Sequence, residues 1–173
     1  MNTLYALIIF ALAVYFAAMV FCSVCRMFML RTIDKAWNEL QALILKKAAL
    51  ITPLRRICDE HKLIYGDLAK TLKPAHKSFV RAKTRRELLG ANKKLSHDVG
   101  RVVLTLSQNK QTAASEEFAD ISEQNAALEQ KINFLEIFFA EHIEKYHTFA
   151  DSLPYMVTGG LVLKKRRPLD SRL

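Results

Sequence analysis

The stretch LEQKINFLEIFFAEHIEKYHTFADSLP, residues 128–154, decides the fold of this chain. It contains no glycine, and its only proline is its last residue. With the residues before it, it repeats core-type positions at alternating intervals of three and four: Phe118, Ile121, Asn125, Leu128, Ile132, Leu135, Phe139, His142, Tyr146 and Phe149. This heptad seam predicts a long helix that begins after Ser115, a good N-cap residue, and ends near Pro154.

Two further amphipathic segments precede this helix. The first carries one apolar face at intervals of three, four and seven: Trp37, Leu40, Ile44, Ile51, Leu54 and Cys58. It predicts a helix that continues to about Leu72 and is kinked or interrupted at Pro53. The second predicts a helix from about Pro74 to Gln108, with an apolar face formed by Leu88, Leu95, Val99, Val102 and Leu106.

Two details of the second segment lead to expectations of their own. Gly90 and Gly100 are unfavourable inside a helix, so we expect them to allow a neighbouring helix to approach closely. The stretch after the segment, QNKQTAA at residues 108–114, is the clearest polar loop in the chain.

The N-terminal segment has the composition of a membrane anchor. Residues 4–25 contain no charged side chain, and about 20 apolar residues span a bilayer core as a helix. A cleaved signal peptide would need a basic leader and a small-residue cleavage site, and the sequence has neither. The basic residues that flank this segment all follow it: Arg26, Arg31, Lys35, Lys46 and Lys47. We therefore predict a single-pass cell-membrane protein with its N-terminus outside and the rest of the chain cytoplasmic.

Composition supports a helical fold. The chain has 173 residues, of which 51% are hydrophobic and 25% are charged, with only 5 Gly and 4 Pro. We predict an all-α protein: an N-terminal transmembrane helix (residues 1–30), an elongated antiparallel bundle of three to four long helices (31–153) and a basic flexible tail (154–173). A parallel coiled-coil oligomer through the last helix is the alternative. The net charge of +9 suits an anionic partner.

Several marks along almost the whole chain coincide with one known family. They are Trp37-x-x-Leu40, Lys46-Lys47, the run LITPL at residues 50–54, VGRVV at 99–103, LEQKI at 128–132, and a late aromatic stretch that ends in Leu153-Pro154. In this order and spacing the chain resembles the LemA family of bacterial membrane-anchored helical proteins. It departs from the family at Ala140 and His147, where asparagine is usual. The resemblance implies a membrane-tethered helical bundle with no known enzymatic activity and no catalytic residues.

The strongest candidate site is a run of basic residues at intervals of four: Lys73, Lys77, Arg81 and Arg85. On one helix they would share a face that could bind an acidic partner, although a merely solvated face is the alternative. Glu116, Glu117, Asp120, Glu123 and Glu129 make the start of the last helix acidic, and Lys164–Arg167 form a second basic cluster. These patches could pair between molecules or within one.

No catalytic or metal-binding motif stands out. Cys22 and Cys25 have CxxC spacing, but they lie in the apolar segment and favour small membrane-helix residues over a metal site or a palmitoylation site. Cys58–His61 and Glu141–His147 hold possible metal ligands, but zinc needs three or four that converge. His142 and His147 are five residues apart and so do not stack on one helical face. We expect no catalytic residues, no metal and no cofactor.

The function that fits these features is a non-enzymatic, membrane-anchored scaffold or adaptor that presents a cytoplasmic helical bundle to partner proteins. The alternative is a basic module that binds phospholipid head groups or nucleic acid at the membrane. Nucleic acid is less favoured, because Phe79 is the only stacking aromatic in the basic stretch. Self-association into a homo-oligomer stays open.

Overall fold

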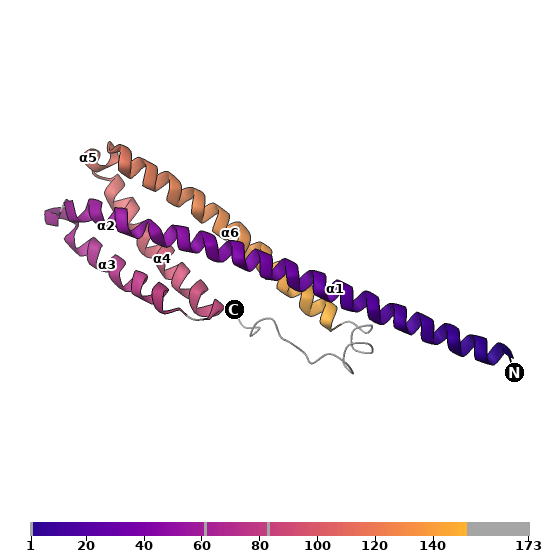
Figure 1. Cartoon of the computed structure of the whole chain (residues 1–173). Coiled ribbons are helices and arrows are strands. Elements are labelled where there is room, and N and C mark those ends of the chain that lie inside the picture. Colours follow the sequence, from indigo (N-terminus) through magenta and orange to yellow (C-terminus); the bar gives the residue numbers. More distant parts are fainter. Residues whose placement is uncertain (1, 61, 83, 152–173) are drawn as a thin grey trace. The chain divides into compact units, whose positions relative to one another are not determined.

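The computed structural model describes residues 2–60, 62–82 and 84–151. Within these residues all regular secondary structure is helical, which confirms the predicted all-α class for this part of the chain (Figure 1). The helices are α1 (Asn2–Ala49), α2 (Ile51–Glu60), α3 (Lys62–Arg81), α4 (Arg85–Ser107), α5 (Lys110–Ala113) and α6 (Glu116–Ala150). The predicted basic tail at residues 154–173, with its cluster Lys164–Arg167, lies outside the described residues.

The chain divides into two compact units, which we describe separately. Among the described residues, the first contains 2–38 and 135–151, and therefore most of α1 and the end of α6. Its core is built on an aromatic pair, because the rings of Trp37 and Phe139 lie 5.6 Å apart at an angle of 44°. Ile33 and Tyr146 are buried in the same unit. The late aromatics of the sequence thus hold the end of α6 in a packed core.

The N-terminal part of α1 is apolar and uncovered. Among the described residues, one helix is long and apolar enough to cross a membrane. Its most apolar 18-residue window has a mean hydropathy of 2.6, and only 6% of that window is buried within the protein. Large side chains such as Leu7 and Phe10 are exposed to about two thirds of their area (67% and 69%). Such a surface suits a lipid environment better than water.

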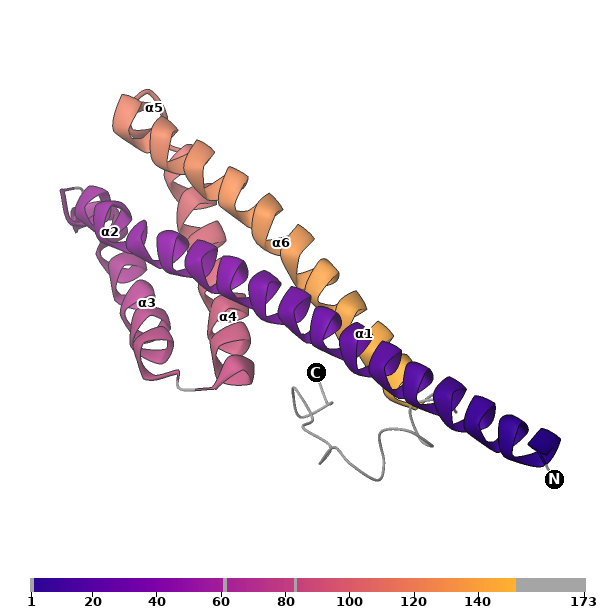
Figure 2. The same cartoon turned by 45° about the vertical axis from the view of Figure 1, so that its right-hand side comes forward.

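The second unit contains Glu39–Phe134. In it α2 packs on α3, and α3 packs on α4. Figure 2 shows α3 and α4 side by side and running in opposite directions, as a short connection between helices favours. The side chains in the core of this unit that solvent does not reach include Leu40, Ile44, Leu54, Leu72, Leu95, Val99, Val102, Leu106 and Ile132.

The predicted seam of α6 is confirmed by burial. Its positions are buried or half-buried along the whole helix, and the helix begins at Glu116, directly after the predicted N-cap Ser115. By contrast, Phe134 and Ile137 lie off the seam and are 67% and 63% exposed. The interval of three and four therefore identified which side of the helix faces the core.

The interruption predicted at Pro53 is also present. α1 ends at Ala49, Leu50 forms a turn, and Pro53 lies in the first turn of α2. Proline has no backbone N–H, but the N–H groups of a first turn have no partner within the helix, so nothing is lost there. Both flanks stay buried, since Ile51 and Leu54 continue the apolar face of α1.

The predicted boundary near Leu72, with a single helix from Pro74 to Gln108, is wrong. Pro74 lies inside α3, which continues to Arg81, and α4 begins only at Arg85. The reason is a capping box at the start of α4. The Thr84 hydroxyl accepts a hydrogen bond from the Glu87 backbone N–H (3.2 Å), and the Glu87 carboxylate accepts one from the Thr84 backbone N–H (3.3 Å).

Two further expectations in this region need correction. A Cβ atom added at Gly90 or Gly100 would meet nothing within 4 Å, so neither glycine allows close approach of a helix. The polar stretch at residues 108–114 is not entirely a loop, because it contains the single turn α5. The Asn109 side chain caps that turn by accepting a hydrogen bond from the backbone N–H of Gln111 (2.9 Å).

Candidate partner-binding surface

The basic residues of α3 point away from the core of their unit. Leu72 and Phe79 are buried (0% and 8% exposed), seven residues apart on one side of the helix. Lys73, Lys77 and Arg81 are exposed on the other side. We call these three residues the α3 basic row. Packing against the core therefore fixes the direction in which their charges point.

The fourth predicted member, Arg85, does not belong to this row. It is the first residue of α4, beyond the helix break, and it is half-buried. A spacing of four places residues on one face only within a continuous helix. The prediction that all four basic residues share a face is therefore wrong for Arg85 and holds for the other three.

The charge of the α3 basic row is not neutralised by any described residue. No ion pair within residues 2–60, 62–82 and 84–151 includes Lys73, Lys77 or Arg81. The neighbouring helix α4 adds four further exposed cations, Arg86, Lys93, Lys94 and Arg101, beside one exposed acid, Glu87. Both helices of this pair thus turn positive charge toward solvent.

An acidic counterpart lies at the start of α6. Glu116, Asp120 and Glu123 are exposed, at intervals of four and three, on the side of the helix opposite the buried Phe118 and Ile121. We call Glu116, Asp120 and Glu123 the α6 acidic row. Glu117, which the sequence grouped with them, is instead paired with Arg56 of α2. Glu129, the fifth member of the predicted patch, is paired with Lys47, so two members are used within the unit and three face solvent.

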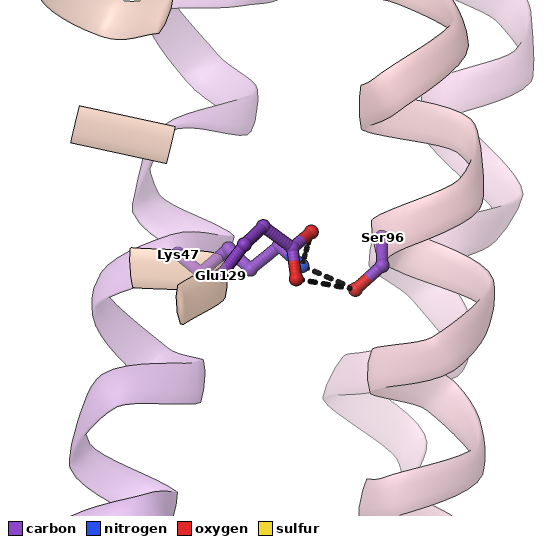
Figure 3. A network of polar contacts seen from close by, with 3 residues as sticks. All are labelled: Lys47, Ser96 and Glu129. Carbon is purple, nitrogen blue, oxygen red and sulfur yellow. Dashed lines mark hydrogen bonds and ion pairs between the residues drawn. The ribbon is translucent and has the colours of Figure 1, made fainter. Parts of the chain in front are cut away.

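A buried charge network joins three helices of the second unit. Lys47 of α1 is completely inaccessible to solvent, and its Nζ contacts the Ser96 hydroxyl of α4 and the Glu129 carboxylate of α6 (Figure 3). The Ser96 hydroxyl in turn donates a hydrogen bond to the second carboxylate oxygen of Glu129 (3.3 Å). Each member thus has partners on both of the other helices, as buried charges require.

From the sequence, Lys47 was interpreted as part of the basic flank of the membrane segment and as one of the marks of the family resemblance, not as a core residue. Its burial could have been foreseen from the apolar face of α1. The interval of seven between Ile44 and Ile51 leaves the core positions three and four residues after Ile44, and the buried Lys47 and Ala48 occupy them. Nothing in the sequence, however, identifies Ser96 and Glu129 as the groups that satisfy it.

The candidate metal ligands have structural surroundings. The His142 ring lies 4.0 Å from the Phe138 ring, and its Nδ1 is 2.8 Å from the Phe138 carbonyl oxygen. Burial, with a smaller contribution from the Asp59 carboxylate, raises the pKa of the Cys58 thiol to about 11. Among the residues that the structure describes, no three His, Cys, Asp or Glu side chains lie close enough together to hold a metal ion. His61 lies outside that part of the chain.

Comparison with known proteins assigns no role to these residues. No model of a known protein family matches this sequence, and no curated protein sequence matches it. The resemblance to the LemA family therefore rests on the sequence marks alone.

Proposed function

We propose that this protein is a non-enzymatic, membrane-anchored scaffold or adaptor, similar in kind to the LemA family, that presents a cytoplasmic helical bundle to partner proteins. The observation that carries the proposal is the α3 basic row, which is exposed and not neutralised within the described chain. Like charges four residues apart destabilise a helix by roughly 0.2–0.5 kcal/mol per pair. Folding alone gives no reason to collect them, whereas an acidic partner does.

The membrane anchor and its orientation support a role on the cytoplasmic face. The N-terminal helix has the length and hydropathy of a membrane span. Arg26, Arg31 and Lys35 follow the apolar segment, and no basic side chain precedes it. Excess Lys and Arg mark the cytoplasmic flank of such a span. The basic row would then face the cytoplasm, where soluble and membrane-bound partners can reach it.

The polar interior supports a structural rather than a catalytic role. A serine beside a lysine is a nucleophile arrangement in some hydrolases, and Ser96 does contact Lys47. A lysine that acts as the base must be neutral, however, and here Nζ of Lys47 is paired with the Glu129 carboxylate. Lys47 is also inaccessible to solvent, so a substrate could not reach it. This network therefore favours a scaffold over an enzyme.

The test uses the full-length protein in its native membrane. We expect the double substitution Lys77→Glu with Arg81→Glu to reduce the recovery of partner proteins from detergent-solubilised membranes by at least about tenfold, or about 1.4 kcal/mol. Helicity and thermal stability should be unchanged, because both side chains are exposed. Unchanged recovery of the same partners would show that the row is only a solvated face.

A matched control separates this row from general positive charge. Lys93→Glu with Lys94→Glu changes the net charge by the same amount on the neighbouring helix α4, where both residues are exposed. A protein partner specific to α3 should be retained by this control.

The exposed cations of α4 favour one second candidate, a surface that binds the phosphates of anionic lipids or nucleic acid. Both double variants should then weaken binding alike, and binding should fall steeply as the salt concentration rises. Vesicles with and without anionic lipid, and a single-stranded oligonucleotide, would identify the phosphate source.

A further inference from the structure

We infer that the α3 basic row binds the α6 acidic row of a second copy of this chain. The inference rests on the proposed function, because it names the partner of the same surface. Both rows belong to the second unit, and in both every side chain is exposed on the side of its helix that faces away from the core.

The two rows match in length and in number of charges. Arg81 follows Lys73 by eight positions, and Glu123 follows Glu116 by seven. At 1.5 Å per residue these rows are about 12 Å and about 10.5 Å long. Each row carries three charges, so every lysine or arginine of one helix can face a carboxylate of the other when the helices lie side by side.

Within one chain the two rows do not meet. None of the ion pairs between described residues joins Lys73, Lys77 or Arg81 to Glu116, Asp120 or Glu123. Asp120 accepts a hydrogen bond from Gln124 of its own helix (2.9 Å), which leaves its charge uncompensated. Repulsion among like charges is therefore present in both rows, and pairing between two copies relieves both at once.

The overall charge makes this pairing selective. With a net charge of +9, two copies repel each other in most orientations. An orientation that places an acidic row on a basic row is attractive. Each copy carries both rows, so a two-fold symmetric pair would form the contact twice. Single exposed ion pairs contribute little, but two copies tethered to one membrane have a high effective concentration.

The experiment uses two differently tagged full-length copies, expressed together, solubilised in mild detergent at about 50 mM salt and co-isolated. We expect wild-type copies to co-isolate. Lys77→Glu with Arg81→Glu in both copies should reduce co-isolation at least about tenfold, or about 1.4 kcal/mol. Asp120→Lys with Glu123→Lys in both copies should do the same, while Lys93→Glu with Lys94→Glu in both should not.

The decisive sample combines the two reversals, one in each copy. The reversed α3 row of one copy then faces the reversed α6 row of the other, and the remaining two rows are native. Both contacts are attractive in the mixed pair and repulsive in either self-pair, so we expect co-isolation to return. The inference would be overturned if co-isolation did not return in this sample. It would also be overturned if wild-type copies did not co-isolate, or if neither charge reversal reduced their co-isolation.

These failures can be distinguished from failure of the proposed function. Other proteins recovered with the wild-type chain are measured in the same samples. If they are lost with Lys77→Glu and Arg81→Glu while self-association is absent, the inference falls and the scaffold proposal stands. If self-association follows the charge reversals but no other protein depends on the row, the inference stands and the adaptor role falls.

Discussion

Lys47 and Glu129 form an ion pair in which only one partner touches water. The lysine side chain is 0% exposed and the glutamate side chain is 25% exposed, although the residues lie 82 positions apart on α1 and α6. The glutamate keeps part of its hydration, so the loss of solvation falls mainly on the ammonium group. The stability of this unit therefore depends on the presence of the carboxylate.

The first prediction follows from that asymmetry. Glu129→Leu should lower the free energy of unfolding by about 3–5 kcal/mol, because it leaves Lys47 charged, buried and without its carboxylate. The double variant Lys47→Met with Glu129→Leu should lose far less, because no buried charge remains. Urea unfolding followed by circular dichroism on residues 31–160 measures both, since this fragment retains nearly all of the buried apolar residues. Equal losses in the single and the double variant would contradict the account.

The seam of α6 gives a comparison between near neighbours. Ile132 is 0% exposed and Phe134 is 67% exposed. Ile132→Ala should lower the free energy of unfolding by about 2–5 kcal/mol, through lost burial and a cavity. Phe134→Ala should change it by no more than about 0.5 kcal/mol. A large loss at Phe134 in full-length protein but not in residues 31–160 would show that a second molecule or the membrane covers it.

Replacing either of the two glycines of α4 by alanine is expected to stabilise the protein. Gly90 and Gly100 lie inside α4 with open space where a Cβ would stand. Gly90→Ala and Gly100→Ala should each raise the free energy of unfolding by about 0.4–1 kcal/mol, because alanine restricts the unfolded chain without a clash. The two effects should add, since the sites share no partner. Destabilisation by either alanine would reveal a contact that the isolated chain does not make.

Alkaline pH should weaken the fold through Cys58. Burial raises the pKa of its thiol to about 11 in the folded protein, from an ordinary value of 9.0. Between these values the unfolded chain ionises first, so the contribution is intact below pH 9 and is lost as pH rises toward 11. By pH 11 the loss should be about 2 kcal/mol. The readout is the pH dependence of wild type minus that of Cys58→Ala, because lysines titrate equally in both. A difference that stays flat up to pH 11 would mean that the thiol titrates normally.

Orientation can be measured in intact cells. A reporter that is active only in the cytoplasm, fused after Leu173, should be active, because the basic flank follows the apolar segment. A reporter that requires the opposite side of the membrane should be silent at the same position. The reverse pattern would invert the proposed topology and remove the α3 basic row from the cytoplasm.

The sequence predicted what depends on local periodicity. The seam from Phe118 to Phe149 is visible as a regular spacing of mostly apolar residues, and the helix interruption near residue 50 is indicated by Pro53. The structure confirms both. The break before α4 was missed although its signal, Thr84-Arg-Arg-Glu87, is a local capping box. Pro74, a residue type that is common in the first turn of a helix, instead led to a predicted helix start at the wrong position.

The polar network could be only half predicted. An unfilled core position at Lys47 is a local signal, and the interval from Ile44 to Ile51 contains it. Its partners are not local, because Ser96 and Glu129 lie 49 and 82 residues away on other helices. The packing of three helices determines which serine and which glutamate of the chain contact Lys47. Spacing along one helix does not contain that information.

The separation of Lys47 from Glu129 also has a consequence during synthesis. At about 5–20 residues per second, a ribosome needs roughly 4–16 s to add the 82 residues between them. During that time the apolar face from Leu40 to Leu54 has emerged without α6 to cover it. A hydrated ammonium group at position 47 interrupts that face for as long as it is uncovered. The same lysine that is inaccessible in the folded protein is therefore expected to oppose aggregation of the nascent chain.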